Sequence, residues 1–197
     1  MMTDSFRHLL IGLLAIPLLC ACTGGEPNVV QGNREGILHY GNGSEPQGLD
    51  PHVVTGVPEN RLIRALFEGL AVKNPYTLEP EPGVAERWEV SEDGTVITFH
   101  INPEARWSNG DPMTAHDYTW SWERALHPKT GNLYAYMLYP VLNAEAFSKG
   151  EIDDFGQVGV KALDELTLQV TLKAPTPYFL QLMDHYSTFA GNKASAP

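Results

Sequence analysis

Few residues of this 197-residue chain stand at spacings that would support catalysis or metal binding. The seven histidines are scattered, and no pair follows the His-x-x-x-His spacing of a zinc site. Asp153 and Asp154 are adjacent carboxylates in a predicted turn, where solvated charges are commoner than an acid–base pair. There is no Gly-rich phosphate loop with its Lys and no Gly-x-Ser-x-Gly elbow. We expect no enzyme, no metal and no cofactor, although a triad assembled from distant residues stays open.

Both cysteines, Cys20 and Cys22, lie near the N-terminus. The remainder of the chain therefore has no thiol pair to form a disulfide, and cysteine-based catalysis and Cys-ligated metals are excluded from it. The tetrad Leu19-Cys20-Ala21-Cys22 resembles a bacterial lipobox, in which the Cys thiol is lipidated and becomes the first residue after cleavage.

The residues before this tetrad read as a targeting segment. Arg7 and His8 give a weakly positive start, and the apolar run over 9–19 is too short to span about 30 Å of hydrocarbon as a helix. We expect residues 1–21 to be a lipoprotein signal peptide, Cys22 to carry the lipid anchor, and 22–35 to be a flexible polar tether. An ordinary signal peptide with incidental cysteines is the alternative.

The composition indicates a folded, acidic protein. Hydrophobic residues make up 43% and charged residues 19% of the chain, which is typical of a packed core rather than of disorder. The formal net charge of −11 argues against nucleic acid and against an anionic membrane surface as partners. Solubility is the simplest meaning of the acidity.

The clearest element is a turn followed by a helix. Asn109-Gly110-Asp111-Pro112 is a turn sequence, since Asn and Gly tolerate positive φ and Pro presets its own φ. Thr114 and Asp117 have the spacing of a capping box, and the residue before Pro128 should end the helix. The spacing therefore predicts a helix over 115–126, with one apolar face made of Tyr118, Trp122, Ala125 and Leu126.

Trp107, Trp120 and Trp122 all fall within this turn and helix. Tryptophan buries a large area, so core packing is the ordinary meaning of such a cluster. A stacking platform for a ligand is the alternative, and the spacing alone does not choose between the two.

The other elements are predicted from the alternation of apolar and polar residues and from the positions of turn-forming residues. Asp93-Gly94 between two alternating runs predicts a hairpin over 88–101, and a second hairpin is expected over 158–172. Helical spacing predicts helices over 59–70 and 178–183. We further expect a short strand at 37–40, no regular element over 78–83 because of its two prolines, and a loose tail at 190–197.

Several motifs in register resemble the family 5 extracellular solute-binding proteins of ABC importers, and the resemblance covers roughly 37–186. The motifs that carry it are Glu68-Gly69-Leu70, Pro82-Gly83-Val84-Ala85-Glu86-Arg87-Trp88 and Trp107-Ser108-Asn109-Gly110-Asp111-Pro112 through Trp122, with Leu49-Asp50-Pro51-His52, Gly56-Val57-Pro58-Glu59, Leu163-Asp164 and Pro177-Tyr178-Phe179 in the same order.

The resemblance implies a mixed α/β fold, that of a class II periplasmic binding protein with an extra domain on its first lobe. Residues 36–67 would begin the first lobe and 68–189 would form the extra domain. Because members of the family are several hundred residues long, the chain resembles their N-terminal part, and we expect the second lobe to be absent from it.

The resemblance also implies a function. The chain would capture oligopeptides outside the cytoplasmic membrane and deliver them to ABC permease subunits, as a lipid-anchored monomer in the periplasm or at the cell surface. By the family register, Thr55, Gly56 and Val57 would contact the peptide backbone and Tyr134 would line the cleft; relatives can hold an acidic residue at the position of Thr55. The alternatives are a receptor of the same fold for a dipeptide, nickel chelate or sugar, and a non-functional remnant.

Overall fold

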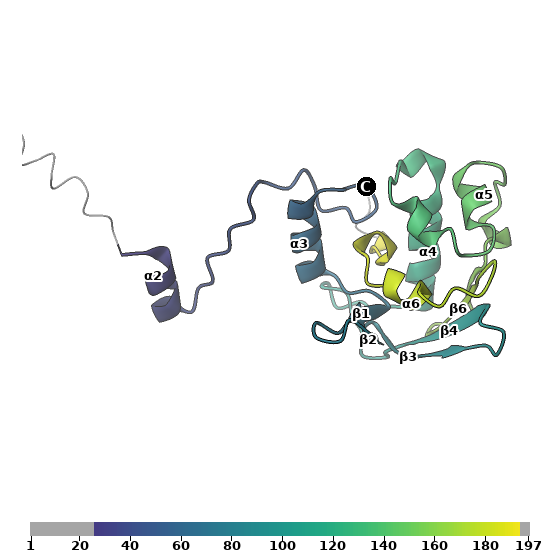
Figure 1. Cartoon of the computed structure of the whole chain (residues 1–197), viewed down its shortest axis with the longest axis horizontal. Coiled ribbons are helices and arrows are strands. Elements are labelled where there is room, and N and C mark those ends of the chain that lie inside the picture. Colours follow the sequence, from purple (N-terminus) through teal and green to yellow (C-terminus); the bar gives the residue numbers. More distant parts are fainter. Residues whose placement is uncertain (1–25, 194–197) are drawn as a thin grey trace, which may run out of the picture. The chain divides into compact units, whose positions relative to one another are not determined.

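The structure is a computed structural model that describes residues 26–193 (Figure 1). The chain divides into two compact units, residues 1–42 and 43–197, which are described separately below. The predicted signal peptide, Cys22 and residues 194–197 of the expected tail lie outside the described residues.

The first unit holds a helix where the sequence led us to expect a flexible tether. Helix α2 spans Asn28–Glu35 and ends at Gly36, whose left-handed φ of 69° lets its N–H bond back to the helix. Arg34 forms two hydrogen bonds with the carboxylate of Glu26, at 3.0 and 2.7 Å. The strand expected at 37–40 does not form, since this segment pairs with no other strand.

The second unit is built on a four-stranded antiparallel sheet of order β3-β4-β6-β5. Its strands are β3 (Ala85–Val90), β4 (Val96–Ile101), β5 (Val160–Ala162) and β6 (Thr167–Thr171). Both predicted hairpins are confirmed, β3–β4 and β5–β6. Alternation fixes which face of each strand is buried: Ile97, Phe99 and Ile101 are buried in β4, and Leu168 and Val170 in β6.

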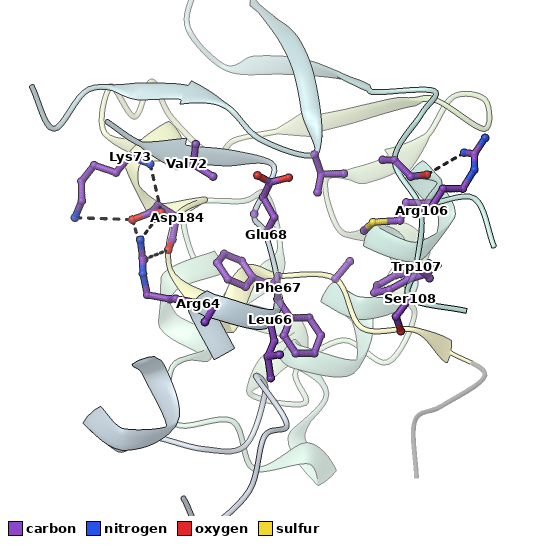
Figure 2. A pocket seen from close by; sticks show the side chains of 17 residues that line it. Arg64, Leu66, Phe67, Glu68, Val72, Lys73, Arg106, Trp107, Ser108 and Asp184 are labelled. Atoms are coloured by element: carbon purple, nitrogen blue, oxygen red, sulfur yellow. Dashed lines mark hydrogen bonds and ion pairs between the residues drawn. The ribbon is translucent and has the colours of Figure 1, made fainter. Parts of the chain in front are cut away.

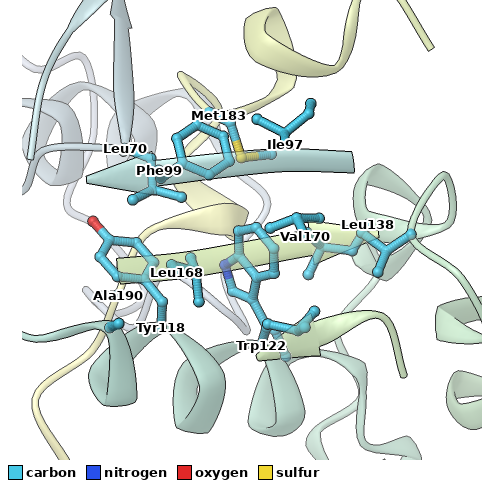
Figure 3. Packing of buried hydrophobic residues seen from close by; sticks show 14 of the residues in the cluster. Leu70, Ile97, Phe99, Tyr118, Trp122, Leu138, Leu168, Val170, Met183 and Ala190 are labelled. Atoms are coloured by element: carbon cyan, nitrogen blue, oxygen red, sulfur yellow. The ribbon is translucent and has the colours of Figure 1, made fainter. Parts of the chain in front are cut away.

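Helix α4 (Ala115–Leu126) covers the buried face of this sheet, and the predicted helix is confirmed at both ends. The carboxylate of Asp117 accepts the backbone N–H of Thr114 at 2.7 Å, as a capping box requires. Figure 3 shows Tyr118 and Trp122 of this helix directed at Phe99, Leu168 and Val170 of the sheet. All four residues of the predicted apolar face are buried: Tyr118, Trp122, Ala125 and Leu126.

Helix α3 (Val57–Leu66) is shifted from its predicted position at 59–70. It begins earlier because Gly56 is its N-cap and Pro58 suits the first turn. It ends earlier because Phe67 is extended and Gly69 lies against another backbone, where a Cβ would be 2.1 Å from the carbonyl oxygen of Met183. The chain therefore leaves the helix before Gly69 and enters β1 (Ala71–Lys73).

The expectation of no regular element over 78–83 is wrong, because β2 (Pro80–Pro82) pairs with β1 in a small antiparallel sheet. The hydrogen bonds to β1 come from the neighbouring residues: Asn74 N donates to Glu79 O at 2.9 Å and Gly83 N donates to Leu70 O at 3.3 Å. Since alternate residues face opposite edges, Pro80 and Pro82 point away from β1 and their missing N–H groups cost no ladder bond.

Four of the remaining elements contact α4: η1 (Pro128–Thr130), η2 (Ala135–Leu138), α5 (Ala144–Ser148) and η4 (Tyr186–Thr188). The other two are η3 (Phe155–Gln157) and α6 (Phe179–Leu182), and α6 contacts β1. The tail is not loose where it is described: Ala190 is buried, and Gly191 N donates to the Ser121 hydroxyl at 2.9 Å.

The fold is mixed α/β, as predicted. Within residues 26–193, no helix has the length and apolar character needed to cross a membrane.

Candidate ligand-binding groove

An open groove of about 340 Å³ brings the four predicted peptide-binding residues together. We call it the tyrosine groove. Thr55, Gly56 and Val57 form one part of its wall and Tyr134 another. Its other lining residues come from α3, β1, η2, α6 and the segment that follows α6: Asn60, Arg64, Lys73, Met137, Gln181, Leu182, Asp184, His185 and Tyr186. The volume lies within the range of about 300–1,000 Å³ typical of small-ligand sites.

The backbone of Thr55–Val57 presents unused donors beside this groove. Among the described residues, no hydrogen bond uses the N–H of Thr55, Gly56 or Val57. The last two precede or begin α3, where a helix leaves its first N–H groups without internal partners. The side chain of Val57 is 61% exposed. This backbone is therefore available for main-chain contacts with an extended ligand.

Two tyrosine hydroxyls fix the backbone that leads into this segment. Tyr186 Oη donates to the carbonyl of Val54 at 3.0 Å, and Tyr134 Oη lies 3.4 Å from the carbonyl of Thr55. Burial and the neighbouring Tyr134 raise the pKa of Tyr186 to about 12. The Tyr186 hydroxyl is therefore protonated at neutral pH and can donate.

A buried carboxylate explains why position 56 is a glycine. Glu59 is 4% exposed, and its Oε1 accepts the N–H of Gln47 at 2.7 Å. Its Oε2 lies so close that a Cβ on Gly56 would be 1.9 Å from it. Since Glu59 is enclosed and cannot swing aside freely, only glycine fits at this position.

The aromatic wall of the groove is a cluster around Tyr134. Its ring centroid lies 4.9 Å from His185, 5.8 Å from Tyr186 and 6.0 Å from Tyr136. His185 and Tyr186 stack on one another at 4.6 Å. Burial and the nearby Arg64 lower the pKa of His185, so this ring is neutral at pH 7. The wall offers apolar ring surface with few charges.

The segment before Thr55 is anchored by a buried polar cluster. Arg124 of α4 forms two hydrogen bonds with the Asp50 carboxylate, at 3.0 and 2.5 Å. His52 is 1% exposed; its Nδ1 lies 2.9 Å from Arg124 Nη1, and its Nε2 lies 3.1 Å from the carbonyl of Phe189. Because Arg124 can only donate, His52 Nδ1 accepts and Nε2–H donates. This neutral tautomer links the 50–54 loop to α4 and to the chain after η4.

The pKa values of this cluster follow from its geometry. Burial lowers the pKa of His52, and the positive charge of Arg124 lowers it further. Burial alone would raise the pKa of Asp50, but Arg124 and the N–H of His52 stabilise the carboxylate and lower the pKa overall. The loop is therefore held most firmly when His52 is neutral and Asp50 is charged.

A second, larger groove of about 760 Å³ adjoins the first (Figure 2). The two share Arg64, Lys73 and Asp184, so this charged group forms the wall between them. The larger groove is also lined by Trp107, whereas Trp122 is fully buried and donates its Nε1–H to the carbonyl of Thr188 at 2.8 Å. Core packing is thus confirmed for Trp122, while Trp107 lies half-buried at a surface.

No motif or spacing in the sequence indicates the residues that complete the tyrosine groove. Arg64 and Asp184 are 120 residues apart, and the run from Asp184 to Thr188 has neither helical nor strand periodicity. Within residues 26–193, no group of three or more His, Cys, Asp or Glu side chains is placed to hold a metal ion.

Comparison with known proteins identifies the family. The family described as "Bacterial extracellular solute-binding proteins, family 5 Middle" matches residues 79–196, more than half of the chain. The chain belongs to this family. Family 5 membership accounts for the motif order seen in the sequence and for the mixed α/β fold.

Three family 5 relatives illustrate the likeness. The periplasmic oligopeptide-binding protein OppA of Escherichia coli is 45% identical over 156 residues, which are 78% of this chain and 28% of OppA. The dipeptide-binding protein DppE of Bacillus subtilis is 36% identical over 184 residues, 89% of this chain and 33% of DppE. The crystal structure of Haemophilus influenzae OppA in complex with RPPGFSPFR matches with a TM-score of 0.73 and 39% identity. The match covers 78% of this chain and 30% of that one. The chain thus spans about a third of the length of its relatives.

Proposed function

We propose that this chain forms part of the ligand-capturing wall of an ABC importer's solute-binding protein, which takes up oligopeptides outside the cytoplasmic membrane and delivers them to permease subunits. The observation that carries the proposal is the tyrosine groove. It collects Thr55, Gly56, Val57 and Tyr134, which the family register had marked as ligand contacts from separate parts of the sequence.

The chemistry of the groove suits an extended peptide of variable sequence. The unused N–H groups of Thr55–Val57 can pair with main-chain carbonyls, which every peptide has, so affinity need not depend on side chains. The half-buried ring of Tyr134, supported from behind by Tyr186, can pack against whichever side chain the peptide presents. Contact of Thr55, Gly56, Val57 and Tyr134 with a peptide is thus our proposal for these four residues.

The chain would bind its ligand without altering it. The relatives named above are binding proteins, and the groove offers main-chain donors and aromatic surface rather than a nucleophile with a base. We propose a monomer that works in the periplasm or at the cell surface, with the permease as its protein partner and no nucleic acid.

We further propose that the lipidated Cys22 anchors the protein to the membrane. Metabolic labelling with a radioactive fatty acid tests this. Incorporation should be lost in Cys22→Ala and kept in Cys20→Ala, and equal labelling of Cys22→Ala and the wild type would disprove the anchor.

A chimera tests the peptide-binding proposal. Residues 36–189 of this chain replace the matching segment of E. coli OppA, and tripeptide binding is measured by titration calorimetry. We expect binding that Tyr134→Ala weakens and that Tyr76→Ala, a change at a 93% exposed tyrosine outside the groove, leaves unchanged. A folded chimera that binds no peptide would refute the proposal.

The 197-residue chain by itself should bind tripeptides more weakly than the full-length relatives, because it spans only 28% of OppA. Micromolar or tighter affinity of the isolated chain would contradict this expectation.

A further inference from the structure

The wall between the two grooves carries two positive charges and one negative charge. Arg64 comes from α3, Lys73 from the end of β1, and Asp184 from the turn after α6. Figure 2 shows both cations reaching the same carboxylate from different elements. The three residues line the tyrosine groove as well as the larger groove.

Arg64 makes most of the hydrogen bonds to this carboxylate. Its Nη1 and Nη2 donate to Oδ2 and Oδ1 of Asp184, both at 2.9 Å, and Nη1 also donates to the Asp184 carbonyl at 2.7 Å. The backbone N–H of Lys73 takes a further position on Oδ1 at 3.3 Å. The Asp184 side chain is only 9% exposed, so it is committed to this fork-shaped pair.

The ammonium group of Lys73 is therefore left with donors to spare. Its Nζ lies 3.8 Å from Asp184 Oδ2, which is near enough for attraction but too long for a hydrogen bond. The Lys73 side chain is 47% exposed and lines the groove. An ammonium has three N–H donors and no acceptor, so a second anion could bind it without displacing Asp184.

The charged side chains that line the groove also favour an anionic ligand. Asp184 is the one carboxylate among the residues that line it, and His185 is neutral because burial and Arg64 lower its pKa. The lining side chains alone, two cations and one carboxylate, therefore sum to a net charge of about +1. The carboxylate of Glu59, which is buried behind Gly56, weakens this positive potential without lining the groove. The chain as a whole has a net charge of −11, so two cations on one groove wall are an exception on an acidic molecule. Glu81, on the strand paired with β1, does not line the groove and binds Asn74 instead.

We propose that Lys73, supported by Arg64, is a carboxylate-binding subsite of the tyrosine groove. This inference deepens the proposed function, on which it rests, by assigning a chemical class to one end of the ligand. The carboxylate would be supplied by the C-terminus of a short peptide or by an Asp or Glu side chain.

Acetate is the first probe, with acetamide as its neutral counterpart. The ¹⁵N-labelled full chain is titrated with each at constant ionic strength, and the backbone amide shifts of Lys73 and Asn74 are followed. Acetate should give saturable shifts and acetamide none. Lys73→Gln should remove the response, whereas Lys161→Gln, which changes an exposed lysine of β5 outside the groove, should keep it. A wild-type chain without a saturable acetate response, or a response that survives in Lys73→Gln, would overturn the subsite.

Three peptides then distinguish the source of the carboxylate: Ala-Ala-Ala, its C-terminal amide, and the amide of Ala-Glu-Ala. A subsite for the C-terminus should favour the free acid over its amide by about twofold to fivefold, the range of a partly exposed ion pair. A subsite for acidic side chains should favour the Glu-containing amide instead. In either case Lys73→Gln should abolish the preference, and a preference that persists in this variant would overturn the assignment.

The acetate titration and the tripeptide titration distinguish failure of the carboxylate subsite from failure of the proposed peptide binding. If acetate binds at Lys73 but no tripeptide shifts the groove residues at any concentration, the carboxylate subsite stands and the peptide-binding proposal fails for this chain. If tripeptides shift Thr55–Val57 but acetate does not bind, the groove binds peptides and the subsite is refuted.

Discussion

The sheet-and-helix core and the wall of the tyrosine groove are stabilised by different forces. In the core, apolar side chains such as Phe99, Leu168 and Trp122 are fully buried against one another. In the groove wall, the backbone at 50–56 is irregular and is held by hydrogen bonds from His52, Arg124 and Tyr186. Apolar burial is insensitive to pH and to small changes of angle, whereas this wall depends on particular donors and protonation states. The core should therefore resist conditions that loosen the groove.

The largest effect is expected in the core. Trp122→Ala should lower the free energy of unfolding by about 3–5 kcal/mol, because it leaves a cavity under the sheet and removes the hydrogen bond to Thr188. Urea unfolding of the full chain followed by circular dichroism measures this. Trp120→Ala, at a half-buried position of the same helix, is the matched control and should cost much less. Equal losses would show that the core is not where stability resides.

The second effect concerns the ion pair behind the groove wall. Arg124→Met should cost about 1–3 kcal/mol of unfolding free energy, because Asp50 and His52 lose their shared partner in a partly buried site. The control is Arg87→Met, which breaks a surface pair whose side chains are 54% and 70% exposed. It should change stability by about 0.5 kcal/mol or less. If both changes cost the same by chemical unfolding, the buried cluster has no special role.

A smaller effect is expected from the tyrosine hydroxyls. Tyr186→Phe should cost about 0.5–1.5 kcal/mol, because its hydroxyl donates to the Val54 carbonyl at 3.0 Å and the donor is buried. Tyr134→Phe should cost less, since its hydroxyl lies 3.4 Å from the Thr55 carbonyl and the bond is weak. Thermal unfolding of the two variants side by side measures the difference, and the reverse order would mean that Tyr134 rather than Tyr186 fixes this backbone.

The smallest effect is a pH dependence carried by His52. Its pKa is lowered in the folded protein below the ordinary value of 6.5, so the unfolded chain binds the proton more readily. The stabilisation is therefore complete above about pH 6.5 and is lost as the pH falls below that value through the folded-state pKa. Urea midpoints between pH 7.5 and 5 should fall for the wild type and fall less for His52→Gln. Because the lowered pKa of His185 acts in the same direction, His185→Gln is measured in parallel, and parallel curves for the wild type and His52→Gln would contradict the role of His52.

Much of the fold could be predicted because its residues repeat with a regular period. The spacing of Tyr118, Trp122 and Leu126 defines α4, and the alternation in β4 and β6 defines the buried face of the sheet. Leu166 alternates with Leu168 and Val170 in the sequence but is 36% exposed, because it lies in the turn just before β6.

The elements that were missed are those in which tertiary contacts override local preference. The prolines of β2 argued against a strand, yet their positions on the outer edge make them compatible with one. Likewise, Gly69 shortened α3 because another backbone passes beside it. These contacts come from residues far away in the sequence, so no local pattern could reveal them.

The candidate site likewise contains some residues that could be predicted from the sequence and others that could not. Thr55, Gly56, Val57 and Tyr134 were predicted through the family resemblance, and the structure places them around one groove. Lys73 and Asp184 carry no motif, and only the folded chain brings them to Arg64. The carboxylate subsite could therefore not have been inferred before the structure.

The small sheet β1–β2 has one further consequence, which concerns how copies of this protein behave when crowded. The outward edge of β2 displays Pro80 and Pro82, neither of which has an N–H to offer. A neighbouring molecule that approached this edge would find too few donors to extend the ladder, so fibril-like stacking is blocked there. Polymerisation of this protein through that side of its structure is thereby disfavoured.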